Sequence, residues 1–170
     1  MIATLGAALV APAAAHAGPT QTVGCAQQSF ATFDGAFTRR ENLVVGPLAW
    51  MGARDARSDG ALGGGYRWKF PALIRAGHRV ALRIPARATA FAGFTYDHKH
   101  GWEFPPRASV VRFSACAPAK AGSRADGRRV SFFSGGVVTN RSPACVPVEI
   151  RTDGGTVRHR TLALGPGAAC

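Results

Sequence analysis

Two histidines and a glutamate in the middle of the chain have the spacing that best suits metal chemistry. His98 and His100 lie two residues apart, and Glu103 follows three residues later. On a strand, the two imidazoles would point to the same face, where such a pair can bind a metal ion. The stretch Asp-His-Lys-His-Gly is also ordinary composition for an exposed hairpin tip. Both hypotheses stay open, and we assign no metal, cofactor-binding or catalytic residue.

Other catalytic patterns are absent from the sequence. No Gly-x-Ser-x-Gly nucleophile elbow occurs, and the nine Asp and Glu residues show no spacing that singles out a pair for acid–base work. The glycines at 63–65 suit a turn between strands better than a phosphate-binding loop. The sequence therefore favours a non-enzymatic protein, without deciding the question.

Aromatic residues are concentrated in the middle third of the chain, and rings beside arginines can stack on sugars and attract acidic groups. Tyr66, Trp68 and Phe70 alternate with basic residues, which favours a place in the core for these three. We expect Trp102 to be the most exposed ring. The other aromatic residues of this region are Phe91, Phe94, Tyr96 and Phe104.

Alternating apolar and polar residues predict the strands that must position these groups. The clearest runs cover 66–70, 79–84, 111–115 and 146–151, and weaker candidates cover 42–48, 90–96, 136–139, 157–164 and a short piece after Cys25. In the run 79–84, Arg79 and Arg83 share the polar face, opposite Val80, Leu82 and Ile84. The chain has 21 glycines and 11 prolines, which disfavour long helices.

Eight or nine short strands predict an all-β fold, a single antiparallel β-sandwich of jelly-roll or immunoglobulin-like type. We place it within residues 18–170, with strands from about residue 22. Residues 18–23 are expected to be a loose leader and 117–129 a solvated loop. Asp153-Gly154 predicts a type I′ turn joining 146–151 to 156–162.

The N-terminus resembles a secretory signal peptide. Residues 2–15 are apolar, and Ala15-His16-Ala17 has the small-x-small pattern of a cleavage site, although no basic residue precedes Arg39. We expect residues 1–17 to be removed and the mature chain to be secreted or extracellular, in the cell envelope. The run is too short to span a bilayer. Cys25 as a lipidated residue is the alternative, but Thr22 replaces the expected Leu.

Four cysteines remain after the signal: Cys25, Cys116, Cys145 and Cys170. An even number in an exported chain predicts two disulfides, and three pairings are possible. We favour Cys25–Cys116, which ties the N-terminal segment to a mid-chain strand, and Cys145–Cys170, which fixes the C-terminus.

The net charge is +12, and arginine supplies 18 of the 21 basic residues. A strongly cationic exported protein is attracted to anionic polymers and lipid surfaces of the envelope. A solvated basic surface without a partner is the alternative. Because the basic residues are spread along the chain and no nucleic-acid module is visible, we expect no specific nucleic-acid partner.

Two resemblances bear on these expectations. Residues 133–170, with FSGGVV, ACVPVEIR and LALGPGAAC, together with FSAC at 113–116, resemble small secreted disulfide-containing proteins of high-GC Gram-positive bacteria. That resemblance implies a bacterial β-domain with paired cysteines and no particular activity. Gly93, His98, His100 and Glu103 loosely resemble the first metal motif of the cupins, with shorter spacers and no second motif.

We therefore expect a non-enzymatic extracellular or cell-envelope β-domain that associates with anionic surfaces through its arginines. The alternative is a small secreted enzyme, metal-dependent through His98 and His100.

Overall fold

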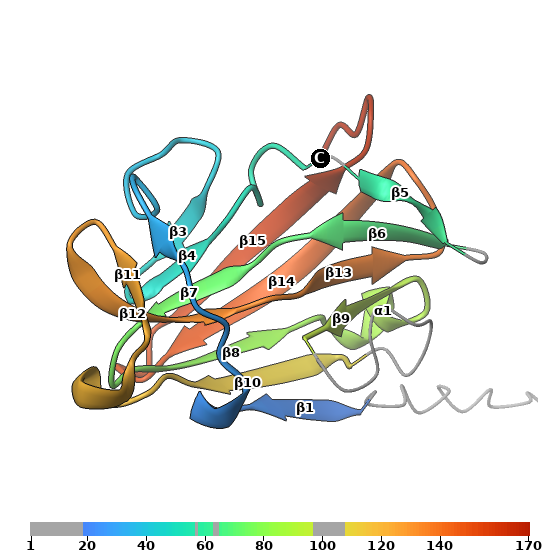
Figure 1. Cartoon of the computed structure of the whole chain (residues 1–170). Coiled ribbons are helices and arrows are strands. Elements are labelled where there is room, and N and C mark those ends of the chain that lie inside the picture. Colours follow the sequence, from blue (N-terminus) through green and yellow to red (C-terminus); the bar gives the residue numbers. More distant parts are fainter. Residues whose placement is uncertain (1–18, 57, 63–64, 97–107) are drawn as a thin grey trace, which may run out of the picture.

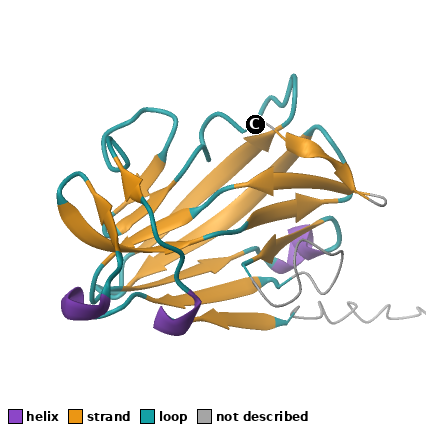
Figure 2. Cartoon of the chain, viewed as in Figure 1, coloured by secondary structure: helices purple, strands orange, loops and turns teal. Residues whose placement is uncertain are grey.

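The computed structural model describes residues 19–56, 58–62, 65–96 and 108–170, and this part of the chain is built mainly of strands. Three short helical segments lie at the periphery (Figure 2). They are η1 (Cys25–Gln27), α1 (Ala86–Thr89) and η2 (Pro118–Lys120). The predicted mostly-β fold with little helix is confirmed for the described residues.

Sheet A contains five strands, of which the last four in spatial order run antiparallel to one another. In spatial order they are β1 (Thr20–Val23), β10 (Val110–Ser114), β8 (Arg79–Arg83), β14 (Ala144–Thr152) and β15 (Val157–Leu164). The long β14–β15 hairpin confirms the predicted pairing of 146–151 with 156–162. β14 also pairs with β8, and β8 with β10, so three of the clearest alternating runs are neighbours (Figure 1).

The chain passes twice directly from a strand of one of sheets B and C to a strand of the other. Sheet B has the order β2 (Thr32–Phe33), β11 (Ser123–Ala125), β12 (Arg128–Phe133), β7 (Ala72–Arg75), β4 (Leu48–Trp50) and β3 (Leu43–Val45). Sheet C has the order β5 (Ser58–Leu62), β6 (Gly65–Lys69), β13 (Gly136–Thr139) and β9 (Ala92–Thr95). β6 runs on into β7, and β12 into β13, and the Phe70 amide bonds to the Gly135 carbonyl at the junction (2.9 Å).

The larger of two hydrophobic core clusters takes side chains from all three sheets. Val80 and Ile150 come from sheet A, Trp50 from sheet B and Trp68 from sheet C, and each is at most 2% exposed. Trp50 Nε1 donates to the Phe70 carbonyl (2.9 Å) and to the Tyr96 hydroxyl (2.6 Å), so its buried polar group is satisfied. Burial raises the pKa of the Tyr96 hydroxyl, which stays protonated and donates to the Phe70 carbonyl.

Both predicted disulfides are formed. Cys25–Cys116 joins the chain just after β1 to the end of β10, and its Cα atoms lie 4.7 Å apart. Cys145–Cys170 attaches the C-terminus to the start of β14, with 5.8 Å between Cα atoms.

The prediction of wholly antiparallel sheets was wrong. β1 runs parallel to β10, and β2 parallel to β11. Both strands come from the N-terminal segment and are attached at sheet edges without a hairpin, so no tight turn forces an antiparallel direction.

Two segments expected to lack strands in fact contain them. Residues 20–23 of the expected leader form β1, because each of them pairs with β10 and Val23 enters the core. The expected solvated loop 117–129 includes η2, β11 and the start of β12. The short apolar side chains of Ala121, just after η2, and of Ala125, on β11, are nearly inaccessible, which the sequence pattern did not reveal.

Turn assignments also differ from those predicted. At Asp153-Gly154 neither residue has positive φ; only the following Gly155 does (75°), which rules out a type I′ turn. The type I′ geometry is found at Asp126 and Gly127, with φ of 50° and 74°, between the paired residues Ala125 and Arg128. The expected single strand 42–48 is instead the β3–β4 hairpin, with Gly46 at φ 53°.

Candidate anion-binding face

The outward side of sheet A is where arginines gather. Val80, Leu82, Val111, Phe113 and Ile150 point into the core and are at most 2% exposed. Because neighbours along a strand face opposite sides, the residues between them point outward. These are Arg79, Ala81 and Arg83 on β8, Arg112 on β10 and Arg151 on β14, and all four arginines are exposed.

Register places the smallest of these residues at the centre. Ala81 is opposite Arg112 on one side and opposite Arg151 on the other. Arg79 and Arg83 are its outward neighbours along β8. With strands ~4.8 Å apart and ~3.3 Å per residue, the backbone positions of the four arginines span about 10 Å by 13 Å around Ala81. We call Arg79, Arg83, Arg112 and Arg151 the arginine face.

One carboxylate borders this face from within the sheet. Glu149 is opposite Arg83 on β8 and opposite His159 on β15. Its Oε2 lies 3.6 Å from Arg83 Nη1, with 28% of the Glu149 side chain exposed and 59% of the Arg83 side chain. Because the pair is partly exposed, solvent screens it and the attraction between the two groups is weak. Neither Arg112 nor Arg151 has an ion pair or side-chain hydrogen bond with another described residue.

A second carboxylate lies at the end of the face and is already occupied. Asp153 Oδ2 lies 2.9 Å from His78 Nδ1 and accepts the Arg79 amide (3.2 Å). Desolvation raises the pKa of the Asp153 carboxyl, but these hydrogen bonds and the His78 charge outweigh it, so the pKa lies below its ordinary value. Asp153 is therefore ionised at neutral pH.

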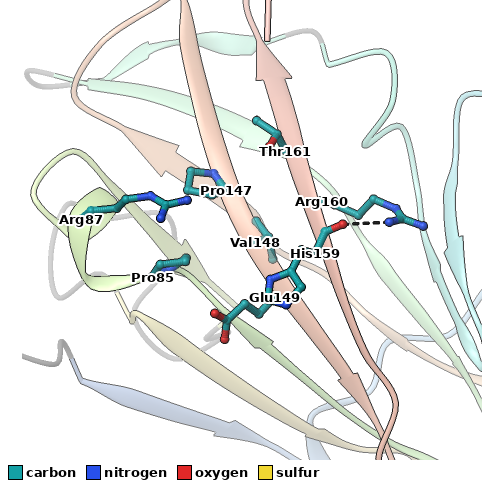
Figure 3. Close-up of a pocket in the computed structure, with 8 residues that line it drawn as sticks. All are labelled: Pro85, Arg87, Pro147, Val148, Glu149, His159, Arg160 and Thr161. Carbon is teal, nitrogen blue, oxygen red and sulfur yellow. Dashed lines mark hydrogen bonds between the residues drawn. The ribbon is translucent and has the colours of Figure 1, made fainter.

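Two shallow depressions lie side by side on this surface and share Glu149. One, of about 350 Å³, is lined by Ala81, Arg83, Val110, Arg112, Glu149, Arg151 and Val157. The other, of about 430 Å³, is lined by Pro85, Arg87, Pro147, Val148, Glu149, His159, Arg160 and Thr161 (Figure 3). In Figure 3 the Arg160 guanidinium points away from Arg87 and donates to the His159 carbonyl oxygen (2.8 Å).

The residues singled out from the sequence are distributed differently. His98, His100, Glu103, Trp102 and Phe104 lie outside the described residues. Trp68, Phe94 and Tyr96 are core residues, each 1% exposed, and Tyr66 stacks on Trp68. The favoured prediction of a core position is confirmed for Trp68 and Phe70, and Tyr66 is partly buried against the same core. The alternative of an exposed aromatic platform is wrong for Trp68, Phe94 and Tyr96.

Arg79 and Arg83 were placed on a polar face by alternation, and the structure confirms it. Arg112 and Arg151 have the same alternation signal, but only strand order and register show that they flank Ala81. His159 and Arg87 were not predicted to belong to a site at all. Their place depends on the β14–β15 register and on the position of α1 after β8.

The chemistry available here is recognition of anions. Guanidinium groups donate in a planar fork that matches carboxylate and phosphate groups. In the described part of the chain, no group of three or more His, Cys, Asp or Glu side chains is arranged to hold a metal ion.

Within the same residues, no helix is long and apolar enough to cross a membrane. Comparison with known proteins found no matching family model, no matching curated protein and no matching solved structure.

Proposed function

We propose that this protein is an exported, non-enzymatic β-domain that associates with anionic surfaces of the cell envelope through the arginine face. The observation that supports this most directly is the grouping of four exposed arginines around Ala81 on one sheet. A net charge of +12 would attract anions from any side, whereas this grouping provides a specific place of contact.

The distance over which charges act on one another supports the same proposal. At physiological ionic strength, exposed charges are screened over about 8 Å. The backbone positions of neighbouring arginines around Ala81 lie within about that distance of one another, so their potentials add over the depression. An anionic group entering it meets several guanidinium donors at once.

We also propose that the chain is exported from the cytoplasm. Removal of residues 1–17 as a signal peptide would deliver the protein outside the cytoplasm of a bacterium, where its two disulfides are stable. We treat the fold as a β-sandwich with sheet A as one layer. The larger of the two hydrophobic core clusters takes side chains from all three sheets, which supports this arrangement.

Salt dependence provides the test. Binding of the mature protein to vesicles rich in anionic lipid and to polygalacturonate is measured between about 0.05 and 0.5 M salt, with neutral vesicles and dextran as controls. We expect appreciable binding at low salt, a steep fall near 0.5 M and little binding to the neutral controls. Absence of binding at low salt would leave only a solvated basic surface and contradict the proposal.

A metal-dependent secreted enzyme using His98 and His100 is the second candidate, supported by the spacing of these histidines and Glu103. Metal analysis of protein purified without a polyhistidine tag tests it. A stoichiometric metal that is lost in the His98→Ala/His100→Ala variant would favour this candidate. Metal-free protein would exclude it.

A further inference from the structure

The second depression beside the arginine face has a different chemical character. Its volume of about 430 Å³ falls in the range of small-molecule sites. Pro85 and Arg87 come from the segment after β8, Pro147 and Glu149 from β14, and His159 and Thr161 from β15 (Figure 3). Two arginines line the depression, but the Arg160 guanidinium points away from Arg87 and donates to the His159 carbonyl, so Arg87 is the arginine placed opposite Glu149. The other lining side chains include two prolines and the polar groups of His159 and Thr161.

Glu149 restricts what can occupy this surface. An ionised carboxylate accepts hydrogen bonds and donates none, so a ligand group placed against it must be a donor. Arg87 donates only, so its ligand partner must be an acceptor, favourably an anion. The prolines offer flat apolar surface between these groups. A ligand that satisfies all of them presents hydroxyl donors, an anionic group and a ring with an apolar face within a few ångströms.

The two depressions form a track along β14. Pro147, Glu149 and Arg151 are the successive outward residues of this strand, about 13 Å from first to last. Pro147 belongs to the second depression, Arg151 to the arginine face, and Glu149 to both. A ligand following this track meets cationic groups at both ends and an acceptor in the middle.

We propose that the outward side of β14 binds an acidic polysaccharide, with one sugar unit in the depression between Arg87 and Glu149 and a neighbouring acidic group at Arg112 and Arg151. This inference rests on the proposed association with anionic surfaces and names its ligand. Sugar hydroxyls donate to Glu149, whereas a chain of phosphates without hydroxyls places negative charge against it. Glu149 therefore selects against bare polyanions.

Polygalacturonate and inorganic polyphosphate are the probes, compared at equal charge concentration and about 0.1 M salt. Wild-type protein should bind polygalacturonate about tenfold more tightly than polyphosphate. Glu149→Gln keeps the side-chain shape and removes the charge. It should bring the two affinities within about threefold of each other, mainly by strengthening polyphosphate binding.

Arg87→Gln tests the depression itself. It should weaken polygalacturonate binding about tenfold, as expected for loss of one hydrogen bond to a charged group. Arg128→Gln makes the same charge change at an exposed position of β12 in sheet B, away from the depression, and should weaken binding by less than about threefold. Unchanged thermal unfolding of each variant verifies that the fold is kept.

The outcomes separate this inference from the proposed function. Equal, salt-sensitive binding of both probes by wild-type protein would overturn the polysaccharide assignment and leave the anionic association intact. Tighter binding to anionic vesicles than to polygalacturonate would also overturn it, in favour of lipid headgroups. Failure of every anionic probe to bind at low salt would overturn the proposed function as well.

Discussion

Removal of the Cys25–Cys116 disulfide should destabilise the fold more than removal of Cys145–Cys170. The first bond spans 91 residues and the second spans 25. Loop-closure entropy of the unfolded chain then gives about 4.6 kcal/mol for the first and about 3.5 kcal/mol for the second. Cys116 is also buried, with 1% exposed, so its replacement removes core contacts and widens the difference.

Denaturant unfolding of two double variants measures this difference. Cys25→Ala/Cys116→Ala should lose about 4–5 kcal/mol of unfolding free energy, and Cys145→Ala/Cys170→Ala about 3–4 kcal/mol. Fully reduced wild-type protein is the control and should be less stable than either variant in its oxidised state. An equal or larger loss for the Cys145–Cys170 variant would refute the reasoning from loop length and burial.

Three further predictions concern the core, a loop and the outward face. Tyr96→Phe should lower the free energy of unfolding by about 1–2 kcal/mol, measured with denaturant, because the Trp50 indole N–H loses one of its two acceptors. An unchanged free energy of unfolding would mean that the Tyr96 hydroxyl is dispensable. The Asp126 carboxylate accepts hydrogen bonds from the Phe37 amide, which has the largest effect on its pKa, and from neighbouring amides of the same loop. These bonds lower the pKa of Asp126 below 3.8. The carboxylate therefore contributes to the free energy of unfolding above that pH, and this contribution is lost as pH falls through the folded-state pKa. Asp126→Asn should flatten acid unfolding below about pH 4, and an unchanged acid limb would contradict this. Arg79→Glu/Arg83→Glu should weaken binding to anionic vesicles while circular dichroism stays the same; unfolding would show that these positions support the core.

Period-2 alternation identified the central strands because their inner side chains are large and apolar. β8, β10 and β14 each place Val, Leu, Ile or Phe in the core at every second position. β1 lacks this signal, since only Val23 of its four residues is buried and the rest are polar. Its position is decided by pairing with β10, which no local pattern encodes. β11 has the same difficulty, because its buried residues are Ser123 and Ala125.

The candidate site shows the same division between local and non-local information. Alternation alone placed Arg79 and Arg83 on one face of a strand. That Arg112 and Arg151 flank Ala81 depends on β8 lying between β10 and β14, and on the register of both pairs. Glu149 beside Arg83 likewise follows from register. A basic surface could therefore be predicted from the sequence, but its centre could not.

The most direct test of the arginine face compares two double variants of equal net charge. Arg112→Glu/Arg151→Glu reverses the pair on either side of Ala81, and Arg124→Glu/Arg128→Glu reverses two exposed arginines of β11 and β12 in sheet B. Affinity for dextran sulfate is measured at about 0.05 M salt, where electrostatic attraction is strong. Loss of charge-assisted hydrogen bonds at the face should weaken the first variant at least about tenfold more than the second. Equal losses would show that net charge alone governs binding and would contradict the account.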